Sequence, residues 1–212
     1  MGGFLYIDNW GIITYTMKRN IKDLPTSTTL LDLCRKNDPD AWARFLKLYK
    51  KLILFWIKEY NVPHVDSDDV LQDVMVTLSK QIVKFKKGAN GKFRNWLRTI
   101  VCSRSMDYHN KNKVNRRKVP LSTVSKIPDP KFSADNITTD QEKKERAILG
   151  RQILTMLKDI CSPAHLKAFE LVTVKGLTAV DAADQLNMTP ENVRQINCRI
   201  RKMIRDEFGD LL

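Results

Sequence analysis

A short acidic run is the part of this sequence that most resembles a catalytic metal motif. Residues 66–73 read DSDDVLQD and place several carboxylates at helical spacing. A DDxxD magnesium site requires a carboxylate where Gln72 stands. Asp68 and Asp73 would also point about 140° apart on a helix, too far to share one ion. We therefore expect no metal site, no cofactor and no enzymatic activity from this run.

The same run predicts an acidic stripe on a helix. Asp66, Asp69 and Asp73 fall on one face, opposite an apolar face that begins with Val70 and Leu71. Acids at a helix start also suit the helix dipole, so a solvated N-terminus is one interpretation. Three aligned carboxylates in a basic protein favour a second interpretation, a contact with a basic surface on a protein partner.

A glycine-flanked basic loop follows this helix. Lys86, Lys87 and Lys92 surround Gly88 and Gly91, and the P-loop pattern GxxxxGK[ST] is absent. The loop is either an ordinary solvated connection or a segment whose lysines contact phosphates.

An aromatic and basic helix comes next. Trp96 lies between Arg94 and Arg98, a combination that can stack unpaired bases and hold a single strand. Phe93 and Leu97 predict a buried stripe with the two arginines to one side, so Trp96 is either a core residue or a stacking platform.

Two helices joined by a tight turn form the sharpest pattern. Thr178 is expected to cap a short helix, and Thr189, followed by Pro190, to cap a longer one. Ala183 is a small residue where the helices would cross, as in a helix-turn-helix. The outward face of the second helix is expected to carry Glu191, Arg194, Gln195, Cys198, Arg201, Lys202 and Arg205. A basic amphipathic helix on a bundle is the alternative.

Charge and composition limit the classes of partner and of fold that this chain can have. Lys and Arg number 37 against 24 Asp and Glu, a formal net charge of +13, which favours a polyanionic partner such as nucleic acid or an anionic membrane surface. With 42% hydrophobic residues the chain has enough for real cores, and it has no run of about 18 apolar residues that would predict a membrane span. The scattered cysteines and histidines predict neither zinc nor disulfides, and reduced thiols suit a cytoplasmic protein.

The fold class expected from these patterns is all-α, with two small helical domains joined by a flexible linker and a helix-turn-helix in the second. Apolar periodicity fills residues 26–112, then fails over the proline-containing stretch 113–145, and returns in 146–212. Residues 1–25 are expected to be an N-terminal extension, of which we hypothesise that 1–16 are dispensable.

Three stretches together resemble the bacterial RNA polymerase sigma-70 family, in its extracytoplasmic-function (ECF) subfamily. Residues 66–74 (DSDDVLQDV) resemble the family's D-A-E-D-L-V-Q-E-V helix, and residues 93–100 (FRNWLRTI) its F-R-x-W-L-x-x-I helix. Residues 176–205 resemble its region 4 helix-turn-helix. Ser103 departs from the Asn of many members, and Asn197 interrupts the usual apolar run.

The resemblance implies a sigma factor that directs promoter recognition and DNA melting and catalyses nothing itself. Its partners would be promoter DNA and the clamp helices and flap of core RNA polymerase, with an anti-sigma protein as an optional further partner. Residues 26–112 would be sigma region 2 and residues 146–212 sigma region 4. A stand-alone helix-turn-helix regulator with an N-terminal interaction domain is the alternative, and it would not need the acidic stripe.

The resemblance also assigns residues to three surfaces. Asp66, Asp69, Gln72 and Asp73 would bind polymerase. Lys86, Lys87, Asn90, Lys92, Arg94, Trp96, Arg98 and Asp107 would bind the melted downstream strand. Thr189, Glu191, Asn192, Arg194, Gln195, Cys198, Arg201 and Lys202 would read the upstream element as duplex.

The polymerase assignment predicts the result of a double charge reversal. Asp69→Lys combined with Asp73→Lys should abolish co-purification with core polymerase, because lysines would repel the basic surface that the stripe meets. Circular dichroism should show an intact fold, since both positions lie on the polar face. Unchanged co-purification would contradict the assignment.

Overall fold

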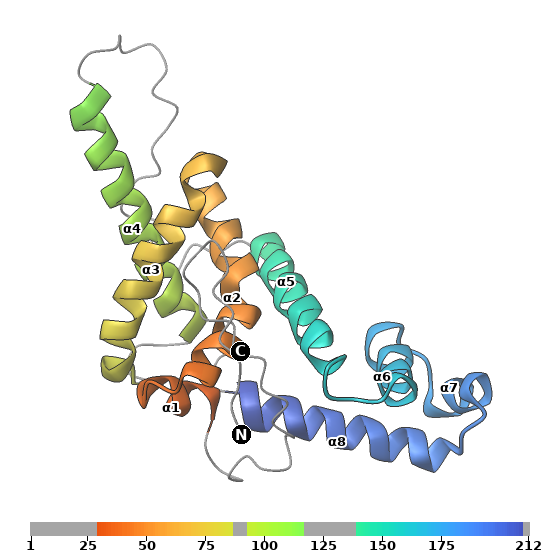
Figure 1. The fold of residues 1–212 in the computed structure, drawn as a ribbon. Coiled ribbons are helices and arrows are strands. Elements are labelled where there is room, and N and C mark those ends of the chain that lie inside the picture. Colours follow the sequence, from red (N-terminus) through yellow and green to blue (C-terminus); the bar gives the residue numbers. More distant parts are fainter. Residues whose placement is uncertain (1–28, 87–92, 117–138, 210–212) are drawn as a thin grey trace, which may run out of the picture. The chain divides into compact units, whose positions relative to one another are not determined.

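The computed structural model describes residues 29–86, 93–116 and 139–209 (Figure 1). Every regular element in these ranges is a helix, which confirms the all-α class. None of the described helices combines the length and apolar character that crossing a bilayer requires. The expected extension, at 1–25, lies outside the described residues.

The chain divides into two compact units. We call the described residues between Leu46 and Arg151 the α3–α4 unit, after α3 (Ser67–Gln81) and α4 (Phe93–Arg116). Those up to Phe45 together with Gln152–Gly209 are the α7–α8 unit, after α7 (Ala179–Leu186) and α8 (Pro190–Phe208). Two helices, α2 (Pro39–Glu59) and α5 (Thr139–Leu157), contribute residues to both units.

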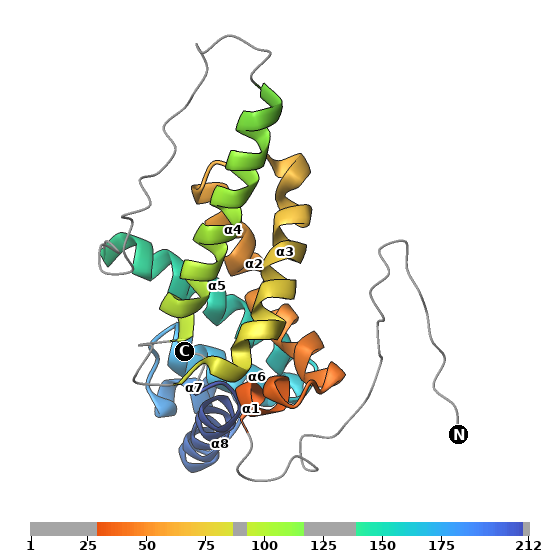
Figure 2. The same cartoon turned by 90° about the vertical axis from the view of Figure 1, so that its left-hand side faces the viewer.

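The α3–α4 unit is built around α2, α3 (Ser67–Gln81) and α4 (Phe93–Arg116). Figures 1 and 2 both show α3 and α4 side by side, and the two helices are in contact. Short 3-10 turns flank α3, at His64–Asp66 and Ile82–Lys84. The apolar residues that fill this unit recur at three- and four-residue steps: Leu48, Tyr49, Leu52, Ile53, Trp56, Ile57, Val70, Leu71, Val74, Leu78, Phe93, Leu97, Ile100 and Val101.

The helix starts follow from local capping chemistry. The Thr29 hydroxyl accepts a hydrogen bond from the Asp32 amide at 3.4 Å and caps α1 (Leu30–Arg35). The Asp38 carboxylate accepts from the Ala41 amide at 2.9 Å and starts α2, with Pro39 in the first turn.

Both ends of the expected linker are helical instead. α4 continues to Arg116 and α5 already begins at Thr139, whereas the sequence predicted irregular chain from 113 to 145. The segment that opens α5 reads TDQEKKER and has no apolar period, but Gln, Glu, Lys and Arg all have good helix propensity. The rest of the expected linker, residues 117–138, lies outside the described residues.

The α7–α8 unit contains the two-helix pattern of the C-terminal part. Thr178 caps α7 through the Asp181 amide (3.2 Å), and Thr189 caps α8 through the Asn192 amide (3.2 Å). Between the helices Asn187 takes a left-handed conformation with φ of 50°, which asparagine tolerates better than most residues. The helices of this unit are α1, the end of α5, α6 (Pro163–Phe169) with its π-helical continuation Glu170–Val174, α7 (Ala179–Leu186) and α8 (Pro190–Phe208).

A small apolar core holds α7 against α8. Leu171, Ala182, Ala183 and Val193 are buried together, and the two alanines let the helix backbones come close. The Met188 amide donates to the Ala183 carbonyl at 3.0 Å, which closes the turn over the same alanine.

This close approach predicts a steric effect at residue 183. Ala183→Leu should lower the free energy of unfolding by about 1–3 kcal/mol, because the three extra carbon atoms of leucine have no space in a fully buried contact. Asp184→Leu, the same new side chain on the exposed neighbouring residue, should change it by no more than about 0.5 kcal/mol. Urea unfolding of both variants, followed by circular dichroism, measures the difference. Equal effects would contradict the packing described here.

Candidate functional site

The acidic stripe on α3 is largely exposed. Asp69, Gln72 and Asp73 project from the surface of the helix. Asp66 differs, because it is half-buried and its carboxylate accepts a hydrogen bond from the Tyr108 hydroxyl of α4 at 2.6 Å. Asp66 makes no side-chain cap for α3, so its acidic group is used to join α3 to α4. Three of the four predicted polymerase-binding residues therefore form a continuous exposed face.

The two arginines of α4 are buried instead of lying to one side. Arg94 is 4% exposed and Arg98 is 5% exposed. Both contact the carboxylate of Glu145, a fully buried residue of α5. Arg98 donates to Glu145 Oε1 at 2.8 Å, and Arg94 Nε lies 3.4 Å from Oε2.

A tryptophan completes this charged cluster. Trp56 of α2 donates its Nε1–H to the same Oε1 of Glu145 at 2.8 Å. The Arg98 guanidinium lies 5.9 Å from the centre of the Trp56 ring, close enough for a cation–π contact. Sequence reasoning missed both residues, because it did not single out Trp56 and it placed Glu145 in the linker.

The neighbouring tyrosines cannot balance the arginines. Burial raises the pKa of Tyr60 to about 12, although Arg98 lowers it in part. Burial also raises the pKa of the Tyr49 hydroxyl well above its ordinary value, against a smaller lowering by Arg94. Both hydroxyls stay neutral at pH 7, so Glu145 is the anion that offsets the two buried cations.

The remaining downstream-strand candidates are spread along α4 and the loop before it. Trp96 is half-buried, with its ring 4.9 Å from that of Phe85 and 5.5 Å from that of Phe93. Asp107 pairs with Arg104 at 3.1 Å, and Lys86 is exposed. The other candidates in the loop, Lys87, Asn90 and Lys92, lie outside the described residues.

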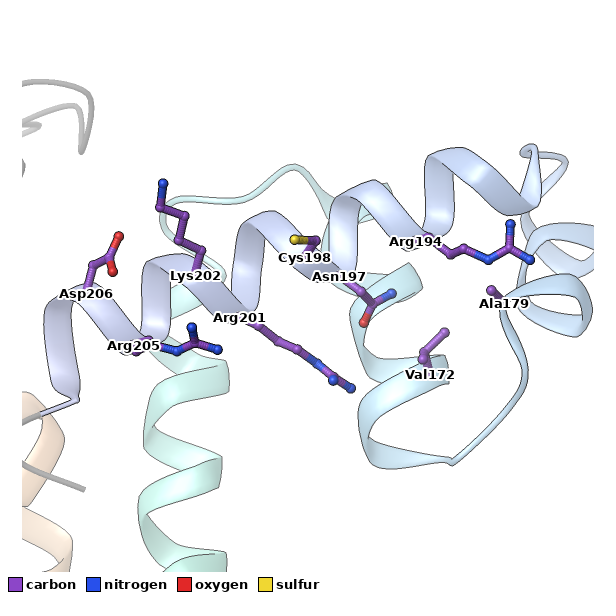
Figure 3. Close-up of a pocket in the computed structure, with 9 residues that line it drawn as sticks. All are labelled: Val172, Ala179, Arg194, Asn197, Cys198, Arg201, Lys202, Arg205 and Asp206. Carbon is purple, nitrogen blue, oxygen red and sulfur yellow. The ribbon is translucent and has the colours of Figure 1, made fainter.

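The upstream-DNA candidates share the exposed face of α8. Thr189 caps the helix through Asn192, and Arg194 forms an exposed ion pair with Glu191 at 3.3 Å. Figure 3 shows Arg194 and Arg201 extending toward the segment that carries Val172 and Ala179. All eight upstream-DNA candidates are exposed: Thr189, Glu191, Asn192, Arg194, Gln195, Cys198, Arg201 and Lys202.

A hollow of about 520 Å³ lies along this face (Figure 3). Four cations of α8 surround it and one acid, Asp206, lies at its end. The excess of positive charge suits an anionic ligand rather than an acidic catalytic pair. Its lining residues are Val172, Ala179, Arg194, Asn197, Cys198, Arg201, Lys202, Arg205 and Asp206.

The hydrogen bonds of Asn197 explain why a polar residue can interrupt the apolar face of α8. Its side-chain amide donates to the Val193 carbonyl at 3.0 Å, and its Oδ1 accepts from the Thr173 hydroxyl at 3.2 Å. Thr173 belongs to the π-helical segment that follows α6. This partly buried pair therefore joins α8 to the segment behind it and fixes how α8 presents its exposed face.

Comparison with known proteins gives one family match. A family model described as Sigma-70 region 2 matches residues 45–114, which include α3 and most of α4. Residues 45–114 are therefore similar to sigma-70 region 2, in agreement with the resemblance to the sigma-70 family in this segment.

Two other comparisons add less. Among solved structures, the chain is similar to one entitled "Structure of CnrH in complex with the cytosolic domain of CnrY", with 15% sequence identity, 84% of this chain and 93% of that chain covered, and a TM-score of 0.34. A likeness this low supports no conclusion about the fold. No curated protein matches the chain.

The Thr173–Asn197 contact predicts an energetic coupling. Thr173→Val and Asn197→Ala should each destabilise the protein, and a double-mutant cycle should give a coupling energy of about 0.5–1.5 kcal/mol, typical of one hydrogen bond. Thr155→Val, on an exposed residue of α5, combined with Asn197→Ala serves as the control and should show additive effects. Additivity in the Thr173 cycle as well would contradict the contact.

Proposed function

We propose that this protein is an ECF sigma factor, which binds core RNA polymerase and directs promoter recognition and DNA melting without catalysing a reaction. The match of residues 45–114 to sigma-70 region 2 is the observation that carries this proposal. A stand-alone DNA-binding regulator would not require that region, so the alternative loses its main support.

The polymerase surface of the proposal is the exposed face of α3. Asp69, Gln72 and Asp73 present two carboxylates and an amide within about one helical turn, and this polar set suits the basic clamp helices of the largest polymerase subunit. Asp66 would contribute by holding α3 against α4 through Tyr108.

The DNA surfaces of the proposal lie on both units. In the α3–α4 unit, the loop before α4 and the residues around Trp96 would take the melted strand, with base stacking and phosphate contacts supplying affinity. In the α7–α8 unit, α8 would enter the major groove, with Glu191, Arg194 and Gln195 near base edges and Arg201 and Lys202 near phosphates. The polymerase flap would hold this second unit.

The proposal also covers location and partners. A protein that works with RNA polymerase on promoter DNA acts in the cytoplasm of a bacterium. Sequestration by an anti-sigma protein rests on the family resemblance alone and stays a prediction.

Reconstituted run-off transcription tests the proposed function. Core polymerase supplemented with this chain should initiate at defined positions on a subset of a promoter library, whereas core polymerase alone should not. Sequence-specific DNA binding by the chain alone, without any polymerase-dependent initiation, would contradict the proposal and favour a stand-alone regulator.

Arg194 and Gln195 give a residue-level prediction. Changing either to alanine should weaken initiation at the preferred promoter by about 1–3 kcal/mol if the side chain contacts a base edge. Arg146→Ala is a matched control for Arg194→Ala, because Arg146 is also exposed and also pairs with a glutamate of its own helix, Glu142. A loss equal across all promoter sequences, with a shallower salt dependence, would instead assign the residue to phosphate contact.

A further inference from the structure

The hollow along α8 combines an apolar wall with a cationic rim. Val172 of the π-helical segment and Ala179, the first residue of α7, form the apolar side, and both are half-buried. In Figure 3 the side chains of Arg194 and Arg201 extend toward these two residues. Charged groups beside apolar carbon suit a ligand that has both an anionic group and an apolar body.

The positive charge of this rim is not neutralised by neighbouring acids. Arg201, Lys202 and Arg205 form no ion pair with any described residue. Among the described residues that line the hollow, Asp206 is the one acid. An anion that enters the hollow is therefore attracted by several cations, and it does not first have to displace a carboxylate from them.

The size of the hollow exceeds what a single phosphate group needs. Its volume of about 520 Å³ falls within the range of sites for small organic ligands, roughly 300–1,000 Å³. A phosphate of a DNA backbone would use the cations but would leave Val172 and Ala179 without an apolar partner. The combination of size, apolar wall and charge therefore favours an organic anion over a phosphate group alone.

We propose that this hollow binds a small organic anion with an apolar body, and that the bound anion competes with duplex DNA for α8. The competition rests on the proposed function, because Arg194 and Arg201 are also candidates for contacts with upstream DNA. The binding of the anion depends on the hollow alone. Because the two ligands would share these arginines, each would lower the affinity of the other.

Cys198 provides a local readout of occupancy, because it is exposed and lines the hollow. The probe is 1-naphthyl phosphate, which joins an anionic group to an aromatic body. Peptide mass spectrometry follows the rate at which iodoacetamide alkylates each cysteine of the full-length wild-type chain. At ten times its half-protecting concentration, the probe should slow alkylation of Cys198 about tenfold. Cys161, half-buried and not among the lining residues, should react at an unchanged rate.

Two further compounds separate the contributions of charge and apolar body. Inorganic phosphate carries the charge without the aromatic rings, and 1-naphthol carries the rings without the charge. Each should need at least about tenfold higher concentration than 1-naphthyl phosphate to protect Cys198, because each lacks one of the two kinds of contact. Equal protection by either compound would overturn the proposal.

Two pairs of variants test the location of the site. Arg201→Gln should raise the half-protecting concentration about tenfold, the effect of losing one charge-assisted hydrogen bond. Its matched control is Arg199→Gln, the same change on an exposed residue of α8 that does not line the hollow. Val172→Ser should raise it about threefold, whereas Val174→Ser, on the exposed end of the same π-helical segment, should not.

The variant pairs also decide against the proposal. If Arg201→Gln and Arg199→Gln have equal effects, the probe responds to the overall charge of α8 and the hollow is not its site. If circular dichroism shows that Val172→Ser has lost helix, the arginine pair alone decides the question.

Run-off initiation by core polymerase with this chain tests the competition. Increasing 1-naphthyl phosphate should inhibit promoter-specific initiation, and Val172→Ser should need about threefold more probe for the same inhibition. If the probe protects Cys198 without inhibiting initiation, the competition with DNA is wrong. If it protects Cys198 but the chain never directs initiation, the anion site stands and the sigma-factor proposal fails. If it leaves Cys198 unprotected, the inference is wrong even where the chain directs initiation.

Discussion

The buried carboxylate of Glu145 is the contact on which the arrangement of the α3–α4 unit depends. Three helices that are far apart in the sequence meet at it, through Trp56 of α2, Arg98 and Arg94 of α4, and α5 itself. Charges enter a protein interior only with partners, because an unpaired ion loses its hydration without compensation. The arginines, the indole and the carboxylate therefore require one another, and removing any of them leaves a buried charge or donor unsatisfied.

The surfaces proposed for macromolecular contact are the faces that packing leaves free. On α3 the apolar residues Val70, Val74 and Leu78 face the core, so Asp69 and Asp73 must face outward. On α8, Val193, Ile196 and Ile200 are buried in the same way. The outward faces differ in sign, acidic on α3 and mainly basic on α8, which matches a basic protein partner for one and DNA for the other.

The helix starts and the apolar faces of the helices could be predicted from the sequence, because they depend on residues that are close together in the chain. The caps at Thr29, Asp38, Thr178 and Thr189 each bind an amide three residues away, so residue type and spacing are enough to predict them. The buried and exposed faces of α8 follow from the helical repeat. The start of α5 was missed since its first turns carry no apolar period, and only helix propensity marks them.

Local sequence decided where the helices begin and which face of each is apolar, because capping and periodicity act over three or four residues. The tertiary structure alone decided which charged and polar side chains of these helices are buried and which partners they pair with. Arg94 and Arg98 are buried because a glutamate about fifty positions away pairs with them. Asp66 is half-buried because the Tyr108 hydroxyl donates a hydrogen bond to its carboxylate. Asn197 is accepted in an apolar face since Thr173 lies opposite. Such pairings depend on which distant helix packs against each residue, and local sequence patterns do not predict the packing of distant helices.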